Sequence, residues 1–228
     1  MPHITISIDG PTASGKTTLA TSLAKYLGLT FLDTGLTFRS LAYAIAHEPT
    51  KARRIQLGAN LKHLPAVYDA SGMLTQSHAI FLDEKEITED IWDPSLDEDL
   101  KRISKEPALR QEILRMHHSI VEECGNVVVV GRDVGVTLLP TASLQIYLTA
   151  SLAVRRERRR AQYRERSDRS TAVGPPTERD EENRVAVWAL RNSIEIQSTY
   201  LPASAVFACA LNRLNQHSAH ITGRHDET

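Results

Sequence analysis

The sequence opens with a β-branched run, a glycine-bounded loop and a helix-forming segment, and this order constrains the fold more than any other feature. Residues 4–8 alternate isoleucine with threonine or serine, which predicts a strand. Gly10, Gly15, Lys16 and Thr17 then match G-x-x-x-x-G-K-[ST], the phosphate-binding P-loop. Backbone N–H groups of such a loop, and the helix N-terminus after it, attract phosphate oxygens. The sequence therefore predicts an α/β fold that binds a nucleoside triphosphate.

The side chains of this loop suggest individual roles. Lys16 supplies a mobile positive charge for the β- and γ-phosphates and is a predicted catalytic residue. Thr17 supplies a hydroxyl for Mg²⁺, and we expect Asp33, at the end of the next strand, to be the second metal ligand. The predicted ATP-binding residues of the loop are Gly10, Pro11, Thr12, Ala13, Ser14, Gly15, Lys16, Thr17 and Thr18.

Length and composition favour one globular domain. The chain has 228 residues, enough for an α/β body with a small insert. Its net charge of −1 argues against a general nucleic-acid or membrane binder, and no apolar run approaches the length of a membrane span. Two cysteines without metal spacing suggest reduced thiols in a cytoplasmic protein. We expect a monomer.

Further strands and helices follow from local patterns. A second strand, 29–32, leads into a helix that carries Phe38 and Arg39, and a helix begins at Pro107. The other predicted strands of the body are Val127–Val130, Leu144–Leu148 and Ala205–Cys209, with a helix over Arg179–Gln197. Between them, Ile55, Leu57, Leu61 and Leu64 suggest a short helix, and Ala66–Asp69, Ala79–Leu82 and Lys85–Ile87 suggest a small antiparallel insert.

These elements predict a P-loop NTPase fold, a three-layer α/β/α sandwich around a parallel five-stranded sheet. We expect a single kinase domain with a core of residues 1–50, 94–150 and 178–215. The remaining parts are a nucleotide-binding insert at about 51–93, an arginine-rich lid at about 151–177 and a flexible tail at 216–228.

The predicted lid is unusually basic. Residues 151–170 contain eight arginines against three acids, and Arg155, Arg158 and Arg159 fall on one helical face. Arginine forks bind phosphates with two hydrogen bonds at once. We therefore expect a closing lid in which Arg155 and Arg159 act on the transferring phosphoryl group and Arg158 binds ATP. An exposed basic helix, or a nucleic-acid contact, is the alternative interpretation.

Arginines near other strand ends supply more positive charge than ATP alone requires. Arg39, Arg132 and Arg184 lie at or near such ends, and Arg110 adds a fourth. A second anionic ligand opposite the γ-phosphate explains the surplus. A phosphate acceptor is already a nucleophile at neutral pH, so the reaction needs charge neutralisation and positioning rather than a base.

The chain resembles the cytidylate (CMP/dCMP) kinase family of nucleoside monophosphate kinases over roughly residues 3–184. The matching motifs are Ile8-Asp9-Gly10-Pro11, Ser14-Gly15-Lys16-Thr17, Leu32-Asp33-Thr34-Gly35, Phe38-Arg39, Ile103-Ser104, Leu109-Arg110, Gly131-Arg132-Asp133-Val134-Gly135 and Leu148-Thr149-Ala150-Ser151. The resemblance implies ATP-dependent phosphorylation of CMP, dCMP or a modified cytidylate, with Mg²⁺.

The resemblance also implies roles for the acceptor-side residues. Arg39, Arg132 and Arg184 would hold the acceptor's phosphate, while Ser104, Arg110 and Asp133 would contact the cytosine edge. Phe38 would lie against the base and Thr34 near the sugar. The acid on the sugar hydroxyls would be Asp180 or Glu181. All predicted substrate-binding residues are Thr34, Phe38, Arg39, Ser104, Arg110, Arg132, Asp133, Asp180, Glu181 and Arg184.

Two other functions stay open at this point. The same scaffold could phosphorylate a hydroxyl of a different small molecule, with Asp33 or Asp133 as the base. An extra helical stretch at 185–199, where the family has a short connection, motivates that alternative. A nucleotide-dependent nucleic-acid-binding protein that uses residues 151–170 is the third possibility.

Overall fold

A computed structural model describes residues 3–47, 60–166 and 193–222. Its strands are β1 (Thr5–Asp9), β2 (Thr30–Asp33), β3 (Leu61–Leu64), β4 (Ala66–Tyr68), β5 (Leu74–Gln76), β6 (Ala79–Leu82), β7 (Lys85–Glu86), β8 (Val127–Val130), β9 (Leu144–Thr149) and β10 (Ser193–Gln197). Its helices are α1 (Lys16–Leu27), α2 (Thr34–His47), α4 (Asp97–Ile103), α5 (Pro107–Cys124), α6 (Val134–Thr137), α7 (Leu152–Arg166) and α9 (Ala203–Thr222), with 3₁₀ turns η1 (Asp90–Trp92) and η2 (Pro94–Leu96).

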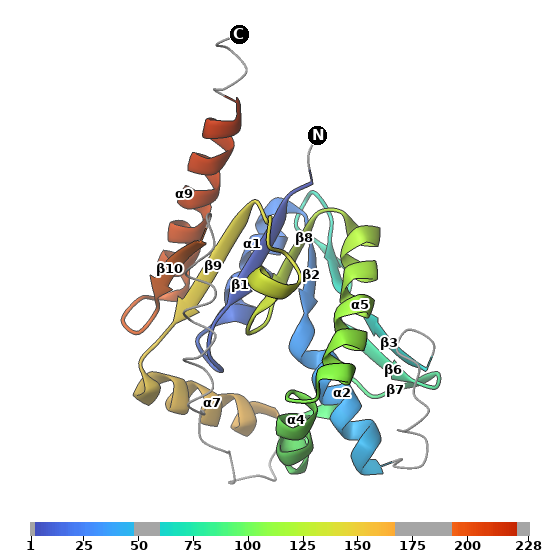
Figure 1. Cartoon of the computed structure of the whole chain (residues 1–228). Coiled ribbons are helices and arrows are strands. Elements are labelled where there is room, and N and C mark those ends of the chain that lie inside the picture. Colours follow the sequence, from blue (N-terminus) through green and yellow to red (C-terminus); the bar gives the residue numbers. More distant parts are fainter. Residues whose placement is uncertain (1–2, 48–59, 167–192, 223–228) are drawn as a thin grey trace.

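The central sheet has the strand order β10-β9-β1-β8-β2-β4-β5. The first five strands run parallel, and β4 and β5 extend the sheet as antiparallel strands. All four valines of β8 are buried because this strand is covered on both faces. Val128 and Val130 pack with α1 and α9, whereas Val127 and Val129 pack with α5 and α6. The predicted α/β/α sandwich around five parallel strands is thus confirmed (Figure 1).

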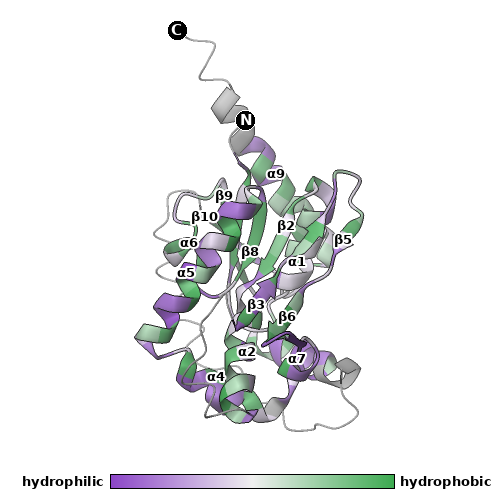
Figure 2. Cartoon of the chain, turned by 90° about the vertical axis from the view of Figure 1, so that its right-hand side faces the viewer, coloured by the Kyte–Doolittle hydropathy of each residue, from purple (hydrophilic) through white to green (hydrophobic). Residues whose placement is uncertain are grey.

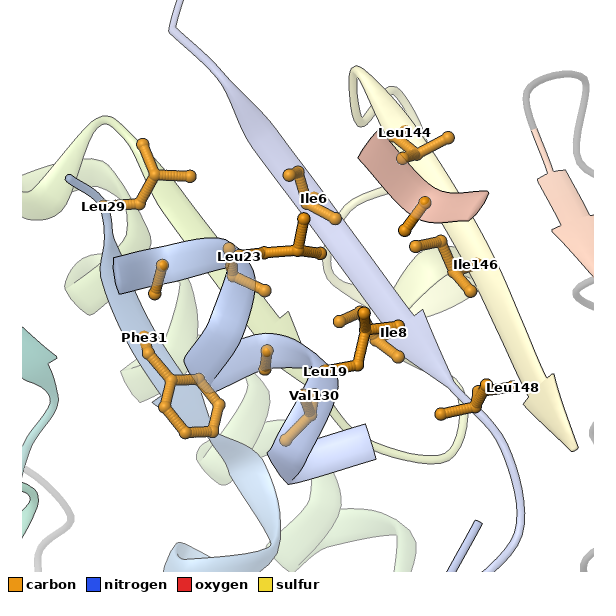
Figure 3. Packing of buried hydrophobic residues seen from close by; sticks show 14 of the residues in the cluster. Ile6, Ile8, Leu19, Leu23, Leu29, Phe31, Val130, Leu144, Ile146 and Leu148 are labelled. Carbon is orange, nitrogen blue, oxygen red and sulfur yellow. The ribbon is translucent and has the colours of Figure 1, made fainter. Parts of the chain in front are cut away.

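The larger core lies between the sheet and helices α1 and α9. Ile6 and Ile8 of β1 point to the same side as Ile146 of β9, and they meet Leu19 and Leu23 of α1 (Figure 3). Because successive strand residues face opposite sides, Ser7 and Asp9 point toward the other layer. This alternation places a buried carboxylate, Asp9, at the carboxyl end of the central strand.

The insert is divided between two sheets. β3, β6 and β7 form a separate antiparallel sheet, whereas β4, predicted as part of the insert, pairs with β2 at the edge of the main sheet. The prediction of a helix that includes Leu61 and Leu64 is wrong: these residues form β3, where buried Leu61 and His63 alternate with exposed neighbours. That period of two is a strand pattern.

Two predictions near the C-terminus are also wrong. Residues 193–197 form the fifth parallel strand, β10, rather than the end of a helix, because Ile194 and Ile196 alternate with polar residues. The rest of the predicted helix over 179–197 lies outside the described residues, as does most of the 185–199 stretch. Ala205–Cys209, predicted as a strand, belongs to helix α9, which is rich in alanine, a strong helix former.

Candidate active site

The P-loop joins β1 to α1 and requires glycine at its first position. Gly10 has φ of 145°, and a Cβ atom there would lie 2.0 Å from the carbonyl oxygen of Leu148 at the end of β9. Gly15 precedes α1 with φ of 103°. The loop is closed internally by a hydrogen bond from the Ser14 N–H to the Pro11 carbonyl, 3.3 Å. Gly10 and Gly15 therefore allow backbone angles and a close approach that a side chain at either position would disfavour.

Two side chains of the motif, Lys16 and Thr17, form hydrogen bonds near the loop. Lys16 folds back so that Nζ donates to the carbonyls of Gly10 and Pro11, at 2.8 Å each. Thr17 Oγ1 donates to Asp33 Oδ2 at 3.4 Å, and the other carboxylate oxygen accepts the Gly35 N–H. The two predicted metal ligands thus lie together and offer hard oxygen donors of the kind that Mg²⁺ prefers. Thr18, in the first turn of α1, is exposed.

The basic face of α7 is turned toward the P-loop. Arg158 Nη1 donates to the Ser14 carbonyl at 3.1 Å, and its guanidinium also bonds the hydroxyl and carbonyl of Ser198, just after β10. Arg155 is buried and donates from Nε to the Ala150 carbonyl, whereas Arg156 is exposed. Arg155, Arg158 and Arg159 lie on the less exposed face of α7, and the helix as a whole is strongly hydrophilic (Figure 2).

A loop that begins at Gly131, after β8, and leads into α6 at Val134 brings two charged residues to the centre of the site. Arg132 Nη2 donates to Thr12 Oγ1 of the P-loop at 3.2 Å. The next residue, Asp133, forms an ion pair with Arg110 of α5. Consecutive side chains of one loop therefore contact the P-loop on one side and α5 on the other.

Buried Asp9 anchors this loop. Its carboxylate accepts hydrogen bonds from the backbone N–H groups of Val134, at 2.6 Å, and Gly135, at 2.8 Å. Burial raises the pKa of Asp9 from 3.8 to about 6, although the two N–H donors act in the opposite direction. The sequence motif contained Asp9 but gave no sign of this role, because its partners are more than a hundred residues away.

The predicted base-contacting residues come together around Arg110. The Arg110 guanidinium bonds the Ser104 carbonyl through Nη1 and the Asp133 carboxylate through Nη2, and its Cζ lies 5.9 Å from the centre of the Phe38 ring. Ser104 contributes its carbonyl to this group, because its hydroxyl donates to the Lys101 carbonyl at 2.9 Å. This group of residues therefore combines an aromatic face, a fork of donors and a carboxylate.

Two more predicted residues lie on α2. Thr34 Oγ1 donates to the Val130 carbonyl at 2.8 Å, a contact that joins α2 to the end of β8. Arg39 is nearly buried, with Nη1 3.4 Å from the Ile91 carbonyl and Cζ 5.0 Å from the Trp92 ring. Asp180, Glu181 and Arg184 lie outside the described residues, and their assignments stay predictions.

A buried histidine network supports this acceptor side. Thr37 Oγ1 lies 2.9 Å from both His63 Nδ1 and His117 Nε2, and with its single proton the hydroxyl can donate to only one of the two rings. His63 Nε2 lies 3.4 Å from His78 Nδ1. Burial lowers the pKa of His63 well below 6.5 and that of His117 to about 3. Neutral imidazoles thus join α2, β3 and α5.

No helix within residues 3–47, 60–166 and 193–222 combines the length and apolar content needed to cross a bilayer. Across the same part of the chain, no group of three or more histidine, cysteine, aspartate or glutamate side chains is arranged to hold a metal ion.

Comparison with known proteins identifies the family. The sequence profile described as "Cytidylate kinase" matches residues 6–216. Cytidylate kinase from Pelotomaculum thermopropionicum is 34% identical over 186 residues, which is 77% of this chain and 78% of the relative. Cytidylate kinase from Streptococcus pyogenes serotype M1 is 36% identical over 160 residues, 70% of each chain. A gluconokinase structure from Sinorhizobium meliloti shares the fold, with a TM-score of 0.52, 10% identity and 97% of each chain covered. The chain belongs to the cytidylate kinase family.

Proposed function

We propose that this chain transfers the γ-phosphoryl group of ATP to a cytidylate (CMP, dCMP or a modified form), giving the diphosphate and ADP. One observation carries the proposal. Arg132 reaches Thr12 of the P-loop, while the adjacent Asp133 pairs with Arg110 beside an aromatic ring. Because Arg132 and Asp133 are adjacent in one loop, a nucleoside phosphate whose base is bound at Asp133 would have its phosphate group near Arg132 and the γ-phosphate of ATP.

The transfer forms one bond and breaks one. An oxygen of the acceptor's phosphate attacks the γ-phosphorus, and the bond from that phosphorus to the bridging oxygen of ADP breaks. Lys16 and Arg132 would neutralise charge on the transferring group, with Arg155 and Arg159 of α7 as the predicted lid contribution. Because the acceptor oxygen is already anionic at neutral pH, no side chain has to remove a proton.

Mg²⁺ fits the donors that Thr17 and Asp33 present, a hydroxyl and a carboxylate oxygen 3.4 Å apart. When bound, it would neutralise negative charge on the β- and γ-phosphates of ATP. The same two residues orient one another in this structure, since Thr17 donates to Asp33. We therefore assign both as residues that would hold the ion.

The residues around Arg110 offer a pattern that suits cytosine. A carboxylate at Asp133 would accept from the exocyclic amine, and the guanidinium of Arg110 would donate to O2 and N3. Phe38 would offer a face to the base. Uracil carries a carbonyl where cytosine carries the amine, so it would place an acceptor against the Asp133 carboxylate.

The other two functions are less well supported by the contacts. Asp33 accepts from Thr17 and Gly35, and Asp133 is paired with Arg110, so both candidate bases for a hydroxyl acceptor are already engaged by donors. On α7, Arg155 is buried and Arg158 holds the P-loop. An inward-facing set of arginines suits phosphates in the site better than a nucleic acid outside it.

ADP release with ATP and a panel of CMP, dCMP, UMP and cytidine tests the proposal. We expect turnover with the two cytidylates and little with UMP. Turnover with cytidine but not with CMP or dCMP would contradict it. Arg110→Ala should raise the KM for CMP at least about tenfold through the loss of base contacts. Arg102→Ala is the matched control, because Arg102 pairs with Asp99 on the surface of α4.

A further inference from the structure

A single carboxylate connects the acceptor side of the site to the lid helix. Asp97, the first residue of α4, has Oδ1 3.5 Å from Arg39 Nη2 of α2 and Oδ2 3.2 Å from Arg159 Nη2 of α7. The three side chains are only 19%, 11% and 14% exposed. Helices α2, α4 and α7 gather beyond the carboxyl ends of the parallel strands, where the P-loop also lies (Figure 1).

The position of Asp97 is not explained by capping of α4. Leu96 is the N-cap residue, and it makes no side-chain capping hydrogen bond. Three acids share the first turn, but the other two pair within α4: Glu98, 90% exposed, lies beside Lys101, and Asp99 pairs with Arg102. A favourable interaction with the helix dipole is available to all three acids. Only Asp97 places its carboxylate between two arginines of the site.

The chemistry of the pair suggests what the carboxylate replaces. A guanidinium binds carboxylate and phosphate oxygens with the same fork of donors, and an anion placed between two guanidinium groups offsets their repulsion. A carboxylate supplies one negative charge, whereas a phosphate monoester dianion supplies two charges and three acceptor oxygens. A phosphate group that arrives at Arg39 would therefore compete successfully for Asp97's partners.

We propose that Asp97 is a positioning residue that stands in for the acceptor's phosphate in the unliganded enzyme. Its carboxylate keeps Arg39 and Arg159 oriented and holds α7 against α4, and it gives up Arg39 when the acceptor binds. The exchange rests on the proposed function in one respect, that Arg39 binds the acceptor's phosphate. The cost of the arrangement is weaker acceptor binding, because Asp97 competes with the substrate for Arg39.

The affinity for CMP gives the first test, with Asp97→Asn compared with Asp99→Asn. Both variants remove one negative charge from the first turn of α4, but only the first removes the competing carboxylate. By calorimetric titration we expect Asp97→Asn to bind CMP about fivefold more tightly, equivalent to about 1 kcal/mol. Asp99→Asn should match the wild type. Unchanged or weaker binding by Asp97→Asn overturns the exchange, since a purely structural role would weaken binding.

Amide hydrogen exchange of α7 gives a second test that needs no nucleotide. In the unliganded protein, α7 amides of Asp97→Asn should exchange faster than those of the wild type and of Asp99→Asn. Equal exchange in all three overturns the holding role of Asp97. If the wild type fails to turn over CMP, the proposed function fails, but the exchange comparison still decides whether Asp97 holds α7. In that case inorganic phosphate replaces CMP in the titration, and tighter phosphate binding by Asp97→Asn is the result that supports the exchange.

Discussion

Replacement of Asp9 by asparagine should separate the activity of this enzyme from its stability. Asp9 is fully buried on β1, and both carboxylate oxygens accept backbone N–H groups of the loop that carries Arg132 and Asp133. Asparagine has nearly the same shape but only one acceptor oxygen, so its NH₂ group would face one of the two N–H donors. The loop should shift to relieve that contact, and the two charged side chains should move with it.

Two opposing contributions set the expected change in stability. An unsatisfied buried donor costs about 1–3 kcal/mol. Against this, the rise of the Asp9 pKa from 3.8 to about 6 means that the buried charge itself costs about 3 kcal/mol at neutral pH. Asp9→Asn removes that cost. We therefore expect the free energy of unfolding at pH 7.5 to change by less than about 2 kcal/mol.

The activity should respond much more strongly. Displacement of a reacting group by about 1 Å commonly lowers the rate about a hundredfold, and we expect a loss of that order in kcat/KM for CMP. ADP release and urea unfolding measure the two quantities on the same preparation. Ser7→Ala is the matched control on β1, because among the described residues Ser7 Oγ has no hydrogen-bond partner. Near-normal kcat/KM in Asp9→Asn would refute the anchoring role.

The pH dependence of the free energy of unfolding gives a second test of the role of Asp9. The folded pKa of Asp9 lies above its value of 3.8 in an ordinary environment, so its contribution to stability is fully present below pH 3.8 and is lost as the pH rises through about 6. The wild type should therefore gain stability relative to Asp9→Asn as the pH is lowered from 7.5 to 4. A constant difference between the two proteins across this range would contradict the burial of a charge.

Three further predictions concern other parts of the site. Asp133→Asn should raise the KM for CMP about tenfold by loss of the amine contact and of its pairing with Arg110, with the KM for ATP, measured in parallel, unchanged; an equal rise in both would argue against base recognition. The pKa of His117 falls to about 3, so the histidine stays neutral in the folded protein while it takes up a proton in the unfolded chain below about pH 6.5. The free energy of unfolding should therefore be lower at pH 5 than at neutral pH by about 2 kcal/mol from this residue. His63 acts in the same direction, and a urea unfolding series that shows no flatter pH dependence in His117→Gln would refute this account. Gly10→Ala would place a methyl group 2.0 Å from a carbonyl oxygen at the end of β9, so ATP binding measured by calorimetry should be lost; retained affinity would contradict the strict requirement for glycine.

Many of the helices and strands could be predicted because neighbouring residues alone determine them. The buried strand β8 reads as four consecutive valines, and α1 ends at Gly28, whose φ of 62° suits the end of a helix. The errors arose where short segments carry mixed signals. Residues 193–197 alternate in a strand period, but the charged sequence before them suggested a helix. The pairing of β4 with β2 of the main sheet, rather than with β3 or β6 of the insert, depends on tertiary contacts that no local pattern encodes.

In the site, too, local motifs could be predicted from the sequence, whereas contacts between distant segments could not. The donor side could be predicted from the sequence, because the P-loop is one contiguous motif whose spacing determines its shape. Arg110 and Asp133 could be placed together only through the resemblance to a family. Asp97, Asp9 and Ser198 were missed as functional residues because each acts on partners from distant segments, such as Ser14 for Ser198. Their residue types are common at helix starts, strand ends and loops, so the sequence alone gave no reason to select them.

The adjacency of Arg132 and Asp133 has a consequence for attempts to redesign the enzyme. Arg132 contacts the P-loop and Asp133 pairs with Arg110, and Asp9 holds the backbone just after both residues. A substitution in this loop that alters base preference therefore risks the transfer chemistry as well. Arg110 belongs to a separate helix, α5, so changes there can be selected with less risk to turnover. A library for new acceptor bases should vary α5 and leave the loop intact.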